Sequence, residues 1–218
     1  PGNFSEELAC LWEFYLLVGM TKDEIKNLAK EATDTKLGEA IGDVVVESSR
    51  ILTGEAEIVR GIYDNGLRIR PEMANLYHEL KRNGIDVYII SASIQELIEV
   101  FATDKSYGYN LDIENIYAMR LKSTIDNILV DEYNYEYPFT QRKGKSEIIE
   151  KFIKSKYNGK GPILVGGDAV GDENMLTEFK DTEILLIMKR EGKLDNLVND
   201  KRVLVQYRNL QTGLLDPK

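Results

Sequence analysis

The sequence of 218 residues has one cysteine and one histidine, Cys10 and His78. A single cysteine excludes an internal disulfide framework and a cysteine-based zinc cluster. With one histidine, neither a histidine-based metal site nor a Ser-His-Asp hydrolase fits well. No apolar run is long enough to span a membrane, and no signal peptide is visible. We therefore expect a cytoplasmic protein that does not have a membrane as its partner.

Positive charge is also scarce, since 28 Lys and Arg residues stand against 37 Asp and Glu residues, for a formal net charge of −9. This balance argues against nucleic acid as a partner. An anionic substrate still fits, provided that its site is locally positive. The apolar fraction of 43% supports a sizeable core in one large α/β domain, or in a core domain with a smaller insert. Nothing in the sequence indicates an oligomeric state.

Helical patterns dominate the first part of the chain. Residues 4–19 form one predicted helix with Ser5 as its N-cap, and Thr21 and Glu24 form a capping box at the start of a second. Residues 54–66 also fit a helix that ends at a glycine. We therefore predict an all-helical domain over residues 1–67.

The pattern changes at residue 68, after which apolar strands alternate with helices. Such alternation predicts a parallel sheet covered on both faces, and we assign residues 68–218 to an α/β core. The segment 116–137 differs, because it fits two strands joined by a polar turn. The predicted helices cover residues 71–84, 93–104 and 144–157, and the predicted strands cover residues 85–91, 162–167, 182–188 and 202–207.

Three places in this core carry candidate site residues at or near the carboxyl ends of strands, where ligands bind in open parallel sheets. The first is Ser91, which follows the run "VYII". Its hydroxyl and the amides of Ala92 and Ser93 at a helix start fit an anion such as phosphate. Taken alone, Ser91 fits an ordinary helix N-cap better.

The second place is Lys145, just before the apolar pattern of the helix in "RKGKSEIIEKF". A lysine at a helix N-terminus opposes the helix dipole, which suggests a use for the charge. Facing a phosphate, it would neutralise charge as a bond to phosphorus breaks. Lys145 fits equally well as a solvated lysine in a basic cluster with Arg142 and Lys143.

The third place is the stretch "VGGDAVGDENML", where Asp168 ends an apolar strand and Asp172 follows one turn later. Carboxylates at the end of a buried strand are costly unless they bind a cation, and an aspartate in this position suits Mg²⁺. Asp172 would orient a metal-bound water or Lys145. The alternative is an acidic capping loop. It is the weaker interpretation, because two aspartates occur in the pattern G-G-D-x-x-G-D after an apolar strand.

Together, "IISAS", "KSEIIEKF" and "VGGDAVGDENML" resemble the haloacid dehalogenase (HAD) superfamily, in its phosphoserine-phosphatase-like branch. "VGMTKDEIKNLAKEA" is similar to part of that branch's helical cap. The resemblance implies a Rossmannoid three-layer α/β sandwich with an inserted helical cap. It also implies Mg²⁺-dependent hydrolysis of a small phosphorylated substrate through an aspartyl-phosphate. By this resemblance, Ser91, Ala92 and Lys145 bind the phosphoryl group, Asp168 ligates Mg²⁺, and Asp172 supports catalysis.

The sequence departs from the family pattern in one respect. The 218 residues contain no D-x-D motif, which in the family supplies the nucleophile and the general acid at the end of a central strand. We expect residues upstream of Pro1 to supply this strand, between the strands of Ser91 and Asp168. The alternatives are a non-catalytic HAD-like phosphate-binding domain and an unrelated α/β protein whose acidic loop holds a structural cation.

A group of aromatic residues near the start of the chain is the one feature of the sequence that bears on the substrate. They either pack in the core of the helical domain, which we favour, or form part of a cage for a quaternary ammonium such as phosphocholine. The group consists of Phe4, Trp12, Phe14 and Tyr15.

Overall fold

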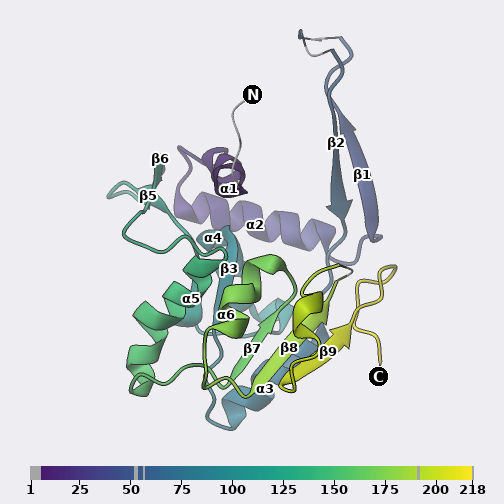
Figure 1. The fold of residues 1–218 in the computed structure, drawn as a ribbon. Helices are drawn as coiled ribbons and strands as arrows, with labels where there is room; N and C mark the ends of the chain where they lie inside the picture. The colour runs from purple at the N-terminus through teal and green to yellow at the C-terminus, as the bar shows by residue number, and fades with distance from the viewer. Residues whose placement is uncertain (1–5, 52–53, 56, 191, 218) are drawn as a thin grey trace.

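The computed structural model of the protein describes residues 6–51, 54–55, 57–190 and 192–217. Two parallel sheets form its lower part (Figure 1). The strands are mostly continuous apolar runs, which is typical of parallel strands covered on both faces. The prediction of parallel strands after residue 68 is therefore confirmed. One sheet has the order β7 (Leu164–Gly167), β8 (Ile184–Lys189) and β9 (Val203–Tyr207), and the other pairs β3 (Ile89–Ile94) with β4 (Ile116–Met119).

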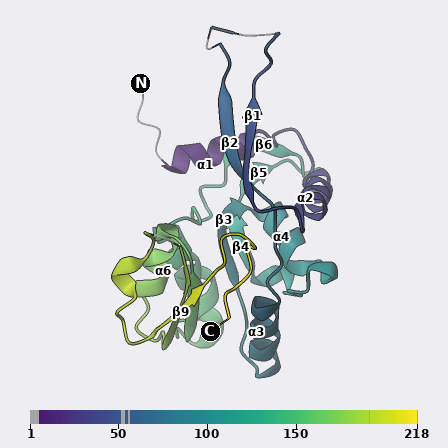
Figure 2. The same cartoon turned by 90° about the vertical axis from the view of Figure 1, so that its right-hand side faces the viewer.

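The two sheets are separate units (Figure 2). Within the described residues, β3 pairs only with β4 and β7 pairs only with β8, so no strand joins them. They share one apolar cluster, which contains Tyr117 of β4, Val165 of β7, and Ile148 and Ile149 from the helix that begins at Lys143. The sheet is thus discontinuous at the place where the family resemblance puts one further strand.

Helices surround these sheets. Pro71 begins its helix at a position where the missing N–H is not needed. The predicted helix over 144–157 is helical throughout but changes its winding, through a π-helical turn at Ile149–Ile153 and a 3₁₀ turn at Lys154–Tyr157. None of the described helices is long and apolar enough to cross a membrane. The helices of this part are α3 (Pro71–Arg82), α4 (Gln95–Thr103), α5 (Lys143–Ile148) and α6 (Glu173–Thr177).

Short elements complete this part. The strands β5 (Leu121–Ser123) and β6 (Leu129–Tyr133) form an antiparallel hairpin, which confirms the prediction of two strands joined by a polar turn. Single 3₁₀ turns lie at Lys105–Tyr107, Ile113–Asn115, Val170–Asp172 and Asp195–Leu197.

Two helices lie above the sheets, α1 (Glu6–Tyr15) and α2 (Lys22–Lys36). The predicted capping box at Thr21 and Glu24 is present, since the Thr21 hydroxyl accepts from the Glu24 N–H at 3.2 Å and the Glu24 carboxylate accepts from the Thr21 N–H at 2.8 Å. The predicted N-cap Ser5 lies outside the described residues.

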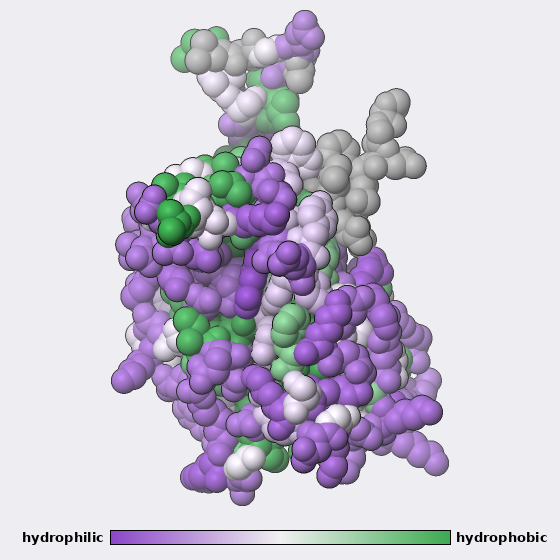
Figure 3. All heavy atoms as spheres, turned by 90° about the vertical axis from the view of Figure 1, so that its left-hand side faces the viewer, coloured by the Kyte–Doolittle hydropathy of each residue, from purple (hydrophilic) through white to green (hydrophobic). Residues whose placement is uncertain are grey.

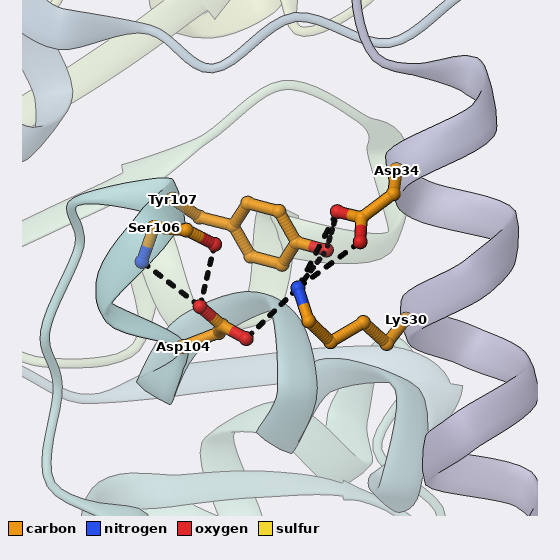
Figure 4. Close-up of polar contacts among 5 residues, drawn as sticks. All are labelled: Lys30, Asp34, Asp104, Ser106 and Tyr107. Carbon is orange, nitrogen blue, oxygen red and sulfur yellow. Dashed lines mark hydrogen bonds and ion pairs between the residues drawn. The ribbon is translucent and has the colours of Figure 1, made fainter.

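A polar network ties α2 to the segment after α4 (Figure 4). Lys30 forms ion pairs with Asp104 and Asp34, each at 3.1 Å. Tyr107 donates a hydrogen bond to Asp34 at 2.6 Å. Hydrogen bonds from Ser106, and then the contact with Lys30, lower the pKa of Asp104 to about 2. The contacts with Asp104 and Asp34 raise the pKa of Lys30.

The all-helical prediction for residues 1–67 is wrong for the stretch after α2. Strands β1 (Gly42–Glu47) and β2 (Arg60–Asn65) form an antiparallel hairpin there, with Val45 opposite Ile62. The reason is the run of three valines in β1, opposite Ile62 and Tyr63 in β2, because β-branched and aromatic residues favour extended backbone over helix. We call this hairpin the arm, because it projects away from the rest of the molecule (Figures 1 and 2).

Candidate functional site

A buried ion pair lies at the carboxyl end of β7. Lys145, in the first turn of α5, contacts Asp172, in the turn after β7, with 2.6 Å between Nζ and Oδ1. Only 11% of the Lys145 side chain and 7% of the Asp172 side chain are exposed. Burying a lysine at a helix N-terminus is unfavourable unless an anion compensates it, and Asp172 is that anion. The structure thus brings together two of the predicted site residues.

The second carboxylate oxygen of Asp172 holds the loop that carries Asp168. It accepts hydrogen bonds from the backbone N–H groups of Asp168, at 2.9 Å, and Ala169, at 3.1 Å. Gly167 allows this close approach, because a Cβ there would lie 2.6 Å from the Cβ of Asp172. Asp172 therefore positions both Lys145 and the Asp168 loop.

Asp168 has a different environment from Asp172. Its side chain is 47% exposed, and Oδ2 lies 3.3 Å from Nη1 of Arg190. Arg190 follows β8, the strand next to β7, at the same edge of the sheet. The sequence interpretation missed Arg190, although the position of a charged residue directly after a parallel strand could have revealed it.

Ser91 lies within β3, not after it. The strand continues through an irregular register to Ile94, which is the N-cap of α4. The interpretation of Ser91 as a helix N-cap is therefore wrong. The expectation that the Ser93 amide is free to bind an anion is also wrong, because this N–H donates a hydrogen bond to the Ser91 hydroxyl at 3.1 Å. Ala92 packs against the apolar cluster that contains Leu11.

The loop before α5 forms hydrogen bonds both to β3 and to the turn after β7. The Thr140 hydroxyl donates to the carbonyl of Ser91 at 2.5 Å, and the Arg142 N–H donates to the carbonyl of Gly171 at 3.0 Å. The turn needs a glycine at position 144, where a Cβ would lie 1.6 Å from the carbonyl oxygen of Phe139. The loop therefore links all three predicted motifs across the gap between the sheets.

The side-chain oxygen atoms near the end of β7 can be compared with the ligands that Mg²⁺ needs. Among the described residues, no three His, Cys, Asp or Glu side chains gather into a metal site. Asp168 offers a half-exposed carboxylate, and Oε1 of Gln141 is buried without a hydrogen-bond partner. Both are oxygen donors, which suit Mg²⁺, and this ion usually completes its shell with water and substrate phosphate.

The predicted aromatic group is divided between core and surface. Phe14 is buried in the apolar cluster with Ile25, and Tyr15 packs against that cluster. Trp12 is 57% exposed and meets Tyr15 edge to face, with 5.9 Å between ring centroids. Phe4 lies outside the described residues. The core interpretation is thus confirmed for Phe14, whereas Trp12 presents its ring to solvent.

No protein-family model matches the chain. Phosphorylcholine phosphatase of Pseudomonas aeruginosa is 31% identical over 219 aligned positions, which cover 89% of this chain and 59% of that protein. The crystal structure of a conserved protein of unknown function from Anaerococcus prevotii has a TM-score of 0.86 and 33% identity, and covers 93% of this chain and 55% of that one. A phosphoserine phosphohydrolase-like protein from Francisella tularensis has a TM-score of 0.46 and 21% identity, covering 62% and 58%.

The identity to phosphorylcholine phosphatase confirms the resemblance found in the sequence. Over most of its own length, the chain is therefore similar in sequence to a phosphatase. It spans between half and two thirds of the length of the Pseudomonas and Anaerococcus proteins that it matches.

Proposed function

We propose that the carboxyl ends of β3 and β7 form the phosphate site of a phosphomonoester hydrolase that acts on a small substrate. The observation that carries this proposal is the Lys145–Asp172 pair. It holds the buried ammonium group of Lys145 at this edge of an acidic protein. A fixed positive charge in a partly desolvated site is well suited to a phosphoryl group. The relation to phosphorylcholine phosphatase supports the same class of reaction.

Each residue has a proposed part in the reaction. Lys145 neutralises charge on the phosphoryl group, and Ser91 donates a hydrogen bond to it. Asp172 keeps the Lys145 ammonium in place and the Asp168 loop closed. Asp168 would hold Mg²⁺, with Gln141, whose side chain lies beside Gly171, as a further oxygen donor. The bound ion would supply positive charge to stabilise the phosphoryl group.

The resemblance further implies an aspartyl-phosphate, and the 218 residues contain no D-x-D to form it. We therefore propose that residues outside these 218 provide the nucleophile on a strand between β3 and β7. The discontinuity of the sheet at that place supports this arrangement. In the same proposal, residues 68–218 form the core of a three-layer Rossmannoid sandwich, and residues 1–67, the arm included, form its cap.

Phosphorylcholine is the first substrate to assay, because the Pseudomonas relative is named for it. The exposed ring of Trp12, beside Tyr15, is suited to a quaternary ammonium through a cation–π contact. If Trp12 binds choline, Trp12→Ala should raise KM for phosphorylcholine and leave KM for p-nitrophenyl phosphate unchanged, whereas Trp12→Phe should retain part of the effect.

The test of phosphatase activity uses the full-length protein with p-nitrophenyl phosphate and Mg²⁺. Ser91→Ala should lower kcat/KM on the order of 10²-fold, as for the loss of one transition-state hydrogen bond. Ser93→Ala is the matched control, since it removes a neighbouring hydroxyl that has no proposed role. Equal activity of the two variants would contradict the role of Ser91.

The second candidate function is a phosphate-binding domain without turnover, which the missing D-x-D favours. In that case inorganic phosphate should bind the full-length protein, and binding should weaken in Ser91→Ala, while no phosphomonoester is hydrolysed. Hydrolysis that is lost in Ser91→Ala would exclude this candidate.

A further inference from the structure

The arm exposes apolar side chains on both of its faces. Val45 and Ile62 lie opposite each other on one face, with 56% and 70% of each residue exposed. Val46 and Tyr63 lie on the other face and are also exposed. Figure 3 shows apolar residues on the arm above a mostly polar body. Such a surface on a projecting element is typical of an interaction site.

Two strands alone make a weak structure. An isolated hairpin is marginally stable in water, and three or more strands are usually needed. Within the described residues, β1 and β2 pair only with each other, so each presents an unpaired edge. Asp43 also lies directly opposite Asp64, and like charges in that relation are destabilising. In the described part of the chain, neither aspartate forms an ion pair.

We propose that the arm binds the arm of a second copy of this chain, with β2 antiparallel to the partner's β2 and a two-fold axis at Ile62. Each copy then contributes two strands to a four-stranded antiparallel sheet. A two-fold interface requires a self-complementary surface. The sequence of β2, RGIYDN, meets this requirement on charge and on shape.

Charge selects this register. With the axis at Ile62, Arg60 lies opposite the partner's Asp64, and Asp64 lies opposite the partner's Arg60. Arg60 already pairs with Glu47 of its own hairpin at 2.7 Å. In the dimer each arginine would therefore lie between two carboxylates, and the repulsion between Asp43 and Asp64 would be reduced.

Shape agrees with charge. The same register places Gly61 opposite the partner's Tyr63, and a Cβ-free position beside an aromatic ring is a favourable cross-strand pair. The space around Gly61 is open, with no atom within 4 Å of a built Cβ. At the axis, the exposed side chain of Ile62 meets the partner's Ile62.

The other edge of the arm lacks this complementarity. Pairing β1 with the partner's β1 around Val45 would place Asp43 opposite the partner's Glu47. Two such carboxylate pairs would oppose association. The charge pattern therefore assigns the contact to β2 and leaves β1 at the outer edge.

Sedimentation of the full-length protein tests the proposal. The wild type should be a dimer, and Asp64→Arg should weaken dimerisation at least tenfold, because it places two arginines opposite each other twice. The double variant Arg60→Asp/Asp64→Arg should restore the dimer. Asp43→Arg makes the same change of charge on β1 and is the control that should remain dimeric. A monomeric wild type, or equal effects of Asp43→Arg and Asp64→Arg, would overturn the proposal.

Cross-linking gives a second readout in a Cys10→Ser background, which removes the native cysteine. Directly opposed residues of antiparallel strands lie within disulfide range. Ile62→Cys should therefore form a disulfide-linked dimer on oxidation, while Val45→Cys, which is also exposed but lies on the neighbouring strand, should not. Two results together would contradict the proposal: Ile62→Cys does not cross-link, and hydrogen exchange shows that β2 is protected in a monomer. The arm would then be covered by its own chain.

Discussion

The strands of the body and the strands of the arm are made of similar residues but have opposite surroundings. Ile187 of β8 is fully buried between helices, whereas Ile62 of β2 is 70% exposed. The body places its apolar strands in a parallel core and the Lys145–Asp172 pair at the carboxyl end of β7. Helix α2 connects to the body both through ion pairs such as Lys30–Asp104 and through Ile25, which is buried in one apolar cluster with Ile94 and Met119.

This difference separates the parts of the structure that packing within one chain stabilises from the part that such packing leaves exposed. Burial in the body fixes the Lys145–Asp172 pair, and with it the edge that we assign to phosphate. The apolar surface of the arm gains little from the rest of the described chain, so its β-branched residues need a partner to be buried.

The largest effect is expected from Asp172, on which the body's site depends. Asp172→Ala leaves Lys145 buried without a counter-charge and should lower the free energy of unfolding by about 3–5 kcal/mol. Urea unfolding measures this change. The double variant Lys145→Met/Asp172→Ala should cost clearly less than the sum of Lys145→Met and Asp172→Ala measured singly. Additive costs would show that the two side chains do not interact.

Core strands and arm strands should differ almost as much. Ile187→Ala should destabilise the protein by about 2–5 kcal/mol, because it leaves a cavity in a closed core. Ile62→Ala, measured in the Asp64→Arg background to keep the chain monomeric, should change the free energy of unfolding by less than about 0.5 kcal/mol. A large cost for Ile62→Ala in that background would mean that the arm is buried within one chain.

A smaller effect is expected at the start of α2. Thr21→Ala removes the hydroxyl that accepts from the Glu24 N–H and should cost about 1 kcal/mol in urea unfolding. Thr35→Ala, near the exposed end of the same helix, is the control and should be neutral or slightly stabilising. Equal effects at both positions would argue against the capping box.

The smallest effect is the pH dependence of the contact between α2 and the body. The pKa of Asp104 is about 2, below its ordinary value of 3.8, owing to hydrogen bonds from Ser106 and the contact with Lys30. Its contribution to stability is therefore complete above about pH 4 and is lost as the pH falls toward 2. The difference in stability between wild type and Asp104→Asn should narrow over this range, and a constant difference would contradict the assignment.

Much of the body followed from the sequence, since continuous apolar runs and capping residues identify parallel strands and helices by local chemistry. The prediction for the arm failed because "GEAEIVRGIYDNG" mixes helix-forming Glu and Ala with β-branched residues, and its pairing partner lies across a loop that has no clear turn signal. Only the pairing with residues 42–47 decides between helix and strand.

At the candidate site, charge beside a buried strand led the sequence analysis to Lys145, Asp168 and Asp172, and the structure places Lys145 and the backbone of Asp168 in contact with Asp172. It did not reveal that β3 extends past Ser91 to Ile94, since the irregular register depends on pairing with Met119. Arg190 was missed because its approach to Asp168 depends on the order of β7 and β8.

The most direct test of the phosphate site is a calorimetric titration of the full-length protein with Mg²⁺ in the presence of inorganic phosphate. The wild type should bind Mg²⁺ and phosphate jointly. Asp168→Asn, at a half-exposed position, should weaken Mg²⁺ binding by at least about 10- to 100-fold, the loss that changing a hydrogen-bond partner of a metal ligand already causes. Asp126→Asn, in the exposed turn between β5 and β6, should bind as the wild type does. Unchanged Mg²⁺ affinity in Asp168→Asn would contradict the account of this site.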